Sequence, residues 1–279
     1  EEPFLRYEVL KALGKLRSGD LGLNFDSKIV SRQIAVDVGR YFQLARVMSM
    51  LPTGTPAADM LGRAIGETQQ LRLESVFRLL GLLYPARDLL NAYHGVVSGR
   101  RILRANAQEF LDNLLTGRHR RLVLSLIDEQ PATEAWLETA VSMGFDPGME
   151  IRTRDEALDF LATGCDPWLG ACAAFAGADN VGRQASHYLD KAGDDMLSPI
   201  EKVLVLQKVD VFSEVPTDQL AALAGIARET NVEADEDIYR EHESPDALYL
   251  VLEGSVKLHQ GDRLITMAGR LTPFGTWAL

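Results

Sequence analysis

The sequence predicts a mainly α-helical chain that ends in a small β domain. From residue 1 to about residue 195, apolar residues recur at helical spacing, whereas Asp246–Gly275 is the only stretch with a clear period of two. Between these regions, residues 179–198 turn polar and contain glycine. The sequence therefore predicts a helical domain over 1–196 and a second domain over 197–279, each long enough to bury a core.

Clusters of Gly, Pro and polar residues divide the first domain into helices. The predicted helices are Pro3–Arg17, Ser27–Leu51, Ala57–Leu83, Ala86–Val97, Arg101–Leu115, Arg120–Asp128, Thr133–Met143, Arg154–Ala162 and Pro167–Ala176. Three stretches, beginning near Pro3, Arg101 and Pro167, carry similar patterns of small and apolar residues. Helix pairs that repeat at roughly forty residues predict an α-solenoid of HEAT type, in which each pair buries its apolar face against its neighbours.

The second domain opens with two predicted helices, Pro199–Leu206 and Thr217–Ala227, and continues into strands. Apolar residues rich in β-formers run through Leu248–Leu252, and Gly254 interrupts the pattern where a bulge or a close backbone approach is expected. The dipeptide Gly261-Asp262 separates Val256–Gln260 from Arg263–Met267, which predicts a tight hairpin.

Several features of this second domain occur in a recognisable order. They are Val211-Phe212-Ser213-Glu214-Val215-Pro216 before a helix, then Ile238, Arg240 and Glu241, then Asp246-Ala247-Leu248-Tyr249, then Leu252 and Gly254, and finally Phe274-Gly275 with Ala278-Leu279. This order resembles the cyclic nucleotide-binding domain, a β-roll (jelly roll) with helical flanks, over about residues 197–279. The resemblance implies a phosphate-binding cassette at Phe274, Gly275, Thr276, Trp277 and Ala278, with cAMP or cGMP as the ligand. In that family, a short helix beginning at the Gly presents backbone N–H groups to the phosphate.

The chain departs from the family pattern at the residues that would hold the ligand. Thr276 stands where the family has a Glu that accepts from the ribose hydroxyl, and the family's phosphate-binding Arg would come after Leu279. Turn glycines expected near Asp235, His242 and Leu271 are missing, and Leu adopts positive φ poorly. We therefore expect weak or no binding of cyclic nucleotides, and we expect the native chain to continue with at least two more strands.

A second resemblance covers most of the chain. The stretches LRLESVFRLLGLLYPARDLLNAYHGVVSG (71–99) and LRANAQEFLDNLL (103–115), followed by the cyclic nucleotide-binding-like region, resemble the soluble tail of bacterial ATP/ADP-carrier-type nucleotide transporters. The resemblance implies a non-enzymatic cytosolic regulatory module, fused to or associated with a membrane transporter domain of the major-facilitator type. It would lie at the cytoplasmic face of the inner membrane.

Two alternatives remain open. In the first, the chain is a protein-interaction scaffold that holds a protein partner on the concave face of the solenoid, with an inert β-roll. In the second, it is a transcription regulator of the catabolite-activator type, which requires a helix-turn-helix after the roll. The net charge of −11 opposes binding to nucleic acid, because such binding depends on basic residues that neutralise phosphates.

The remaining patterns exclude several classes of chemistry. No apolar run approaches the roughly 18 residues of a membrane span, and no nucleophile–base or phosphate-loop motif predicts an enzyme. The five histidines have no metal-ligand spacing, Cys165 and Cys172 are expected to be reduced core thiols, and the acidic run 233–237 is expected to be a solvated turn. The basic run Arg118-His119-Arg120-Arg121 fits either a solvated helix start or a contact with phosphate or acidic lipid.

Overall fold

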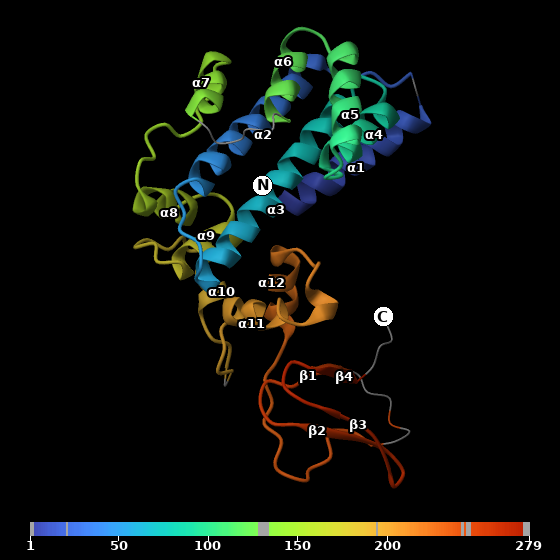
Figure 1. The fold of residues 1–279 in the computed structure, drawn as a ribbon, viewed down its shortest axis with the longest axis vertical. Coiled ribbons are helices and arrows are strands. Elements are labelled where there is room, and N and C mark those ends of the chain that lie inside the picture. The colour runs from blue at the N-terminus through green and yellow to red at the C-terminus, as the bar shows by residue number, and fades with distance from the viewer. Residues whose placement is uncertain are drawn as a thin grey trace. The chain divides into compact units, whose positions relative to one another are not determined.

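The computed structural model describes residues 3–20, 22–127, 134–193, 195–240, 243 and 247–275. The chain is mainly helical and carries a small β part made of two sheets (Figure 1). It divides into two compact units, residues 1–182 and residues 183–279. The structure thus groups residues 183–196 with the second unit, whereas the sequence suggested a boundary near residue 196.

The first unit is built from helices that pack with their sequence neighbours. They are α1 (Pro3–Gly19), α2 (Ser27–Met48), α3 (Pro56–Leu80), α4 (Ala86–Val97), α5 (Arg101–Leu114), α6 (Gly117–Leu126), α7 (Glu134–Ser142), α8 (Arg154–Ala162) and α9 (Pro167–Phe175). The pairs α2–α3, α4–α5 and α8–α9 each pack together, and α3 also packs against α9 (Figure 1).

Short-range sequence signals explain where several of these helices begin. The Asp26 carboxylate accepts from two backbone N–H groups at the start of α2, and Thr55 does the same for one N–H before Pro56 opens α3. Thr153 and Glu156 form a capping box at α8. Asp166 caps α9, whose first residue is a proline. These side chains satisfy N–H groups that a helix cannot pair internally.

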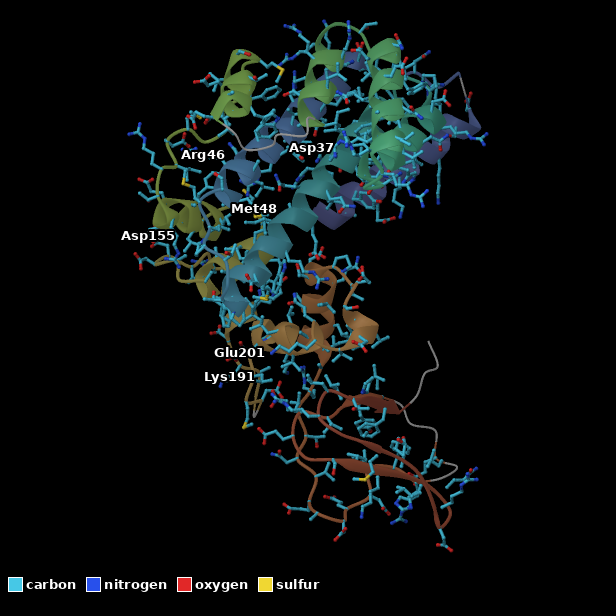
Figure 2. The ribbon with its side chains drawn as sticks, viewed as in Figure 1. Asp37, Arg46, Met48, Asp155, Lys191 and Glu201 are labelled. Carbon is cyan, nitrogen blue, oxygen red and sulfur yellow. The ribbon has the colours of Figure 1, made fainter. Side chains whose placement is uncertain are left out.

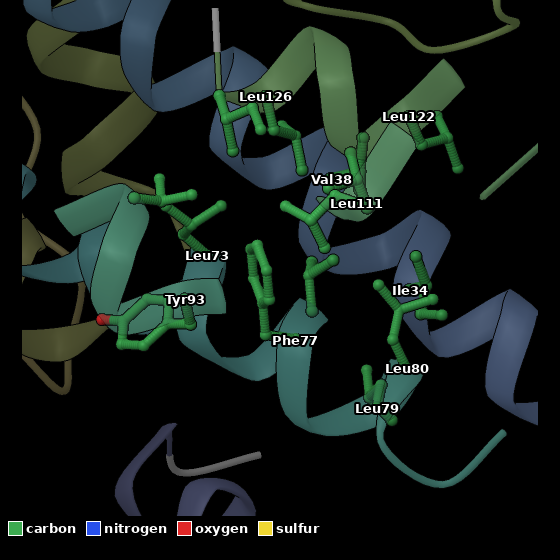
Figure 3. Close-up of a cluster of buried hydrophobic side chains, with 14 of the residues drawn as sticks. Ile34, Val38, Leu73, Phe77, Leu79, Leu80, Tyr93, Leu111, Leu122 and Leu126 are labelled. Carbon is green, nitrogen blue, oxygen red and sulfur yellow. The ribbon is translucent and has the colours of Figure 1, made fainter. Parts of the chain in front are cut away.

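A single buried apolar cluster joins α1 through α7. Phe77 of α3 lies among side chains from neighbouring helices, and its ring centroid is 5.5 Å from that of Tyr93 on α4 (Figure 3). Ile34 of α2 and Leu111 of α5 are at most 1% exposed in the same cluster. Full burial of one such side chain stabilises the fold by about 1.5–3 kcal/mol, so this cluster is the main source of stability in the first unit.

The second unit begins with short helices, α10 (Ser186–Leu189), α11 (Pro199–Leu206), a 3₁₀ turn at Asp210–Phe212 and α12 (Thr217–Ile226). Ser198 and Glu201 form a capping box at α11. The Lys202 ammonium donates to Asp195 at 2.6 Å and to the Ala227 carbonyl at 2.9 Å, and both ends of the ion pair are buried. These bonds connect α11 to the segments before it and after α12.

The β part consists of two antiparallel pairs. The strand β1 (Leu248–Leu250) pairs with β4 (Pro273–Gly275), and β2 (Val256–Gln260) pairs with β3 (Arg263–Ala268). Gln260 lies opposite Arg263, which confirms the hairpin predicted at Gly261-Asp262. Among the described residues, every strand lies after residue 247, as the period-two pattern predicted.

Several sequence-based boundaries are wrong in detail. The strand expected over Leu248–Leu252 ends at Leu250. Ile238 and Arg240, which the resemblance to the cyclic nucleotide-binding domain places in its strand pattern, lie outside any strand. The helix expected over Ser27–Leu51 ends at Met48, and the short helix α10 was not predicted at all. The ends expected at Asp128 and Thr133 lie outside the described residues.

Gly254 does not have the role that its position in the strand pattern predicted. The irregularity in the β2–β3 ladder falls between Leu258 and His259, and a Cβ at Gly254 would meet nothing within 4 Å. Its φ of +80° instead places it in a bend between β1 and β2. Glycine is favoured there because of the backbone conformation and not because of a close approach.

Candidate ligand site at the β1–β4 corner

Three aromatic rings form the floor of the corner where β1 meets β4. The ring centroids of Tyr249 and Phe274 are 5.3 Å apart, and Tyr239 lies 6.1 Å from Tyr249 and 6.4 Å from Phe274. The three rings are within 25° of parallel. Antiparallel pairing places Tyr249 directly opposite Phe274, and cross-strand aromatic pairs of this kind stabilise a sheet. The sequence pattern around Phe274 gave no sign that two tyrosines would join it.

Gly275 occupies the tightest position in the corner. Its φ is +106°, and a Cβ there would lie 2.6 Å from the Ala247 carbonyl oxygen and 3.1 Å from the Tyr249 ring. Any larger residue would therefore need a conformation that L-residues rarely adopt and would also displace the backbone of its partner strand. The glycine predicted from the cassette pattern is thus required by the geometry of the chain itself.

Two non-glycine residues adopt left-handed backbone conformations. Asp235 has φ of +64° and Leu271 has φ of +62°, and both are positions where the resemblance led us to expect a turn glycine. Leu271 is held there by its backbone, because its N–H donates to the Val251 carbonyl at 2.8 Å. A leucine in this conformation costs about 1–2 kcal/mol, so the turn is maintained against the preference of its own residue. His242, the third such position, lies outside the described residues.

The structure describes only part of the predicted cassette. Phe274 is 5% exposed and packs with Val251 and Ala268, while Gly275 ends β4 opposite Leu248. The predicted residues Thr276, Trp277 and Ala278 lie outside the described residues. The described part of the cassette is therefore a packed corner, in which Phe274 is buried and Gly275 has no room for a side chain.

The basic run at 118–121 lies in the first turns of helix α6, as expected for a solvated helix start. The Arg120 guanidinium donates to both carboxylate oxygens of Asp112, at 2.6 and 2.9 Å, and the Arg118 guanidinium lies 5.8 Å from the centre of the Phe145 ring. His119 differs from the expected surface role because it is half-buried. Its ring nitrogens lie 3.0 Å from the Ser31 hydroxyl and 3.1 Å from the Tyr84 hydroxyl.

Those contacts favour the neutral imidazole of His119. Burial, followed by the positive charge of Arg118, holds the pKa of His119 below its ordinary value. A neutral ring can accept at one nitrogen and donate at the other, which suits the two hydroxyl partners. His119 therefore links α2 to the segment before α4 as a structural hydrogen-bonding group.

The acidic run and the cysteines show no metal chemistry in the described part of the chain. The Glu233 backbone N–H donates to the Glu236 carboxylate at 2.9 Å, which closes a turn, and Asp237 pairs with Arg240. No group of three or more potential metal ligands comes together among the described residues. Both cysteines are free. Cys165 is exposed, so the expectation of a core thiol is wrong for this residue. Cys172 is buried, and its burial raises the pKa of the thiol well above its ordinary value.

Comparisons with family models, with curated proteins and with solved structures returned no match for this chain. Among the described helices, none combines the length and the apolar character needed to cross a membrane.

Proposed function

We propose that this chain is a non-enzymatic regulatory module, the soluble tail of a nucleotide transporter, with a HEAT-like helical array followed by a degraded β-roll of the cyclic nucleotide-binding type. The observation that carries the proposal is the left-handed backbone at Asp235 and Leu271 together with the crowded Gly275. The resemblance calls for glycine at the first two positions, and the chain keeps the turn geometry there without the glycine. A turn kept at such a cost supports descent from a roll of that type.

The same comparison supports weak or absent binding of cAMP and cGMP. The aromatic floor and Gly275 belong to the packing of the corner, whereas Thr276 replaces the carboxylate that binds ribose. Titration calorimetry of the protein with cAMP, cGMP and ATP should give no submicromolar binding. Thr276→Glu should strengthen binding only if an arginine is supplied from beyond Leu279, and Thr276→Gln serves as the uncharged control of similar size.

The transporter assignment has its own test. The coding sequence upstream of Glu1 should contain about a dozen apolar spans, as a major-facilitator-type transporter requires. A soluble enzyme or a DNA-binding domain in that place would refute the assignment and leave the fold proposal standing. Submicromolar binding of a cyclic nucleotide by the unmodified protein would refute the degraded pocket instead.

A second function, that of a protein-interaction scaffold, is favoured by a groove between α4 and α5. Gly95 lets the helices approach so closely that a Cβ there would lie 3.0 Å from the Ala107 Cβ. The groove has a volume of about 320 Å³, and Leu103 and Phe110 remain 41% and 39% exposed along it. Exposed apolar side chains beside a groove are typical of peptide recognition.

This function predicts a partner that binds through apolar side chains. Phe110→Glu should abolish cross-linking to that partner, whereas Val141→Glu, which alters a similarly exposed apolar residue on α7, should leave it intact. Equal loss in both variants would contradict a role for the groove.

A further inference from the structure

One buried carboxylate in the first unit serves two arginines. Asp37 lies on α2 (Figure 2) and is fully buried. Its carboxylate accepts from both terminal nitrogens of Arg6, with Nη2–Oδ2 at 2.8 Å. The same carboxylate accepts from Arg72 Nη1 at 3.1 Å. Arg6 also donates to the Gln33 side chain at 3.3 Å. The network joins α1, α2 and α3 and contains one more cation than anion.

A third arginine stands on the same stripe of α2. Arg40 follows Asp37 by three residues, which places the two side chains on one face of the helix. The Gln69 amide donates to the Tyr41 carbonyl at 3.4 Å, so this part of α2 lies beside the turn of α3 that carries Arg72. Burial lowers the pKa of Arg40, and the positive charge of Arg72 lowers it further, against the opposing charge of Asp166.

Arg40 makes no ion pair and no hydrogen bond with any residue that the structure describes. Its guanidinium carbon lies 5.0 Å from the centre of the Phe160 ring, and a Cβ at Gly164 would lie 3.5 Å from its Nη2. Asp166, the carboxylate whose charge acts on Arg40, uses its Oδ1 to cap α9, with bonds of 3.1 Å to two backbone N–H groups. The guanidinium therefore keeps its donors free beside an aromatic ring and a glycine.

Both the balance of charges and the unused hydrogen-bond donors around Arg40 and Arg72 are consistent with a bound anion. Arg6 and Arg72 share the single carboxylate of Asp37, Arg40 has no ion pair, and the buried Nε of Arg72 has no partner among the described residues. Partly buried guanidinium groups without partners cost free energy, because their desolvation is not offset by hydrogen bonds. Natural sequences tend to retain such costly groups where they act on a ligand.

We propose that Arg40 and Arg72 bind a phosphate-class oxyanion at the junction of α2, α3 and the α8–α9 loop. The planar fork of a guanidinium matches two oxygens of a phosphate, and the fork of Arg40 makes no other hydrogen bond among the described residues. Arg72 donates to Asp37 through Nη1 and adds a second positive charge, which favours a doubly charged oxyanion over chloride. The same chemistry fits inorganic phosphate and the phosphate of a nucleotide. The site differs from the β1–β4 corner, and the binding is independent of the function proposed above.

The test compares melting temperatures of the 279-residue protein in phosphate and in chloride, at the same pH and ionic strength. Phosphate should raise the melting temperature of the unmodified protein, since a ligand that binds only the folded state stabilises it by mass action. Arg40→Met should abolish this increase, and calorimetry should show that its affinity for inorganic phosphate falls by about tenfold or more. Arg40→Lys, which keeps the charge and loses the fork, should retain part of the affinity.

A matched control distinguishes binding at this site from a general effect of the protein's net charge. Arg63→Met on α3 removes the same charge from a residue already paired with Glu67, and its response to phosphate should equal that of the unmodified protein. In chloride, Arg40→Met should melt at a higher temperature than the unmodified protein, because it removes an unpaired cation while keeping an apolar stem over Phe160. A purely structural Arg40 predicts the opposite change.

Two results would overturn the proposal. One is an unmodified protein that melts at the same temperature in phosphate and in chloride. The other is Arg40→Met that still gains stability from phosphate. Titration with AMP alongside inorganic phosphate then identifies the source of the oxyanion. Tighter binding of AMP assigns the site to a nucleotide, and equal or weaker binding assigns it to free phosphate.

Discussion

The helical unit and the β part of this chain are held together in different ways. The buried cluster of the helical unit runs from Leu10 to Phe145 and includes residues from seven helices. In the described β part, the buried apolar residues are Val251, Ala268 and Phe274. The β part instead contains Gly275, which no other residue could replace without strain, and Leu271 in a left-handed conformation. Buried volume dominates the first region, and backbone conformation dominates the second.

The largest expected effect tests the helical side of this comparison. Phe77→Ala removes a side chain that is 1% exposed and should lower the free energy of unfolding by about 3–5 kcal/mol. Urea unfolding followed by far-ultraviolet circular dichroism measures it. Ile102→Ala on α5, where the side chain is 76% exposed, should change stability by less than about 0.5 kcal/mol. Similar losses in both variants would contradict a dominant core.

The next effect tests the β side. Gly275→Ala and Gly254→Ala both force alanine to positive φ, but only Gly275 has a backbone oxygen where the Cβ would lie. We expect Gly254→Ala to cost about 1 kcal/mol and Gly275→Ala about 3 kcal/mol. Hydrogen exchange should show lost protection at Leu248–Leu250 only in the second variant. Equal costs would show that the corner relaxes around a new side chain.

A smaller effect of opposite sign is expected at Leu271. Leu271→Gly relieves a left-handed leucine and should raise the stability of the β part by about 0.5–1 kcal/mol, after allowing for the greater backbone entropy of glycine. Leu264→Gly, within strand β3, should lower it by a similar amount. Thermal unfolding of both variants measures the difference. A destabilised Leu271→Gly would mean that the leucine side chain matters more than its backbone.

The smallest effect is a pH dependence confined to the helical unit. The folded-state pKa of His119 is lowered, so its contribution is fully present above its ordinary pKa and is lost as the pH falls through the folded-state value. Stability should therefore decline as the pH falls below about 6.5. His119→Gln, which can still bond to Ser31 or Tyr84, should flatten this decline. An unchanged pH profile would assign the effect to other groups.

Short-range signals in the sequence predicted most helix starts and the hairpin, because caps and tight turns depend on a few adjacent residues. Asp166 before Pro167, and Gly261-Asp262 between two strand patterns, are examples. From the sequence, the missing glycine at Leu271 counted as a departure from the family pattern, yet the leucine adopts a positive φ. The role of Gly254 was misjudged, because a strand pattern cannot distinguish a bulge from a bend.

What the sequence could not predict depends on contacts between distant segments. The joining of Tyr239 to Phe274 requires the chain to return over more than thirty residues, and no local period signals it. The burial of His119 depends on Ser31, which lies 88 residues away. Arg40 looks like any other surface arginine on a helix until Phe160 and Asp166 are placed around it.

The rates at which the two cysteines react with a thiol reagent can report the opening of the helical unit. Cys165 is exposed and should react with a thiol reagent at once, whereas Cys172 is fully buried in α9 and should react only when that helix separates from its neighbours. Both thiols lie within residues 1–182. The slower of the two reactions, at Cys172, therefore measures the opening of that unit alone. The rate at which the second label appears would then report how often the interior of the helical unit meets solvent under native conditions.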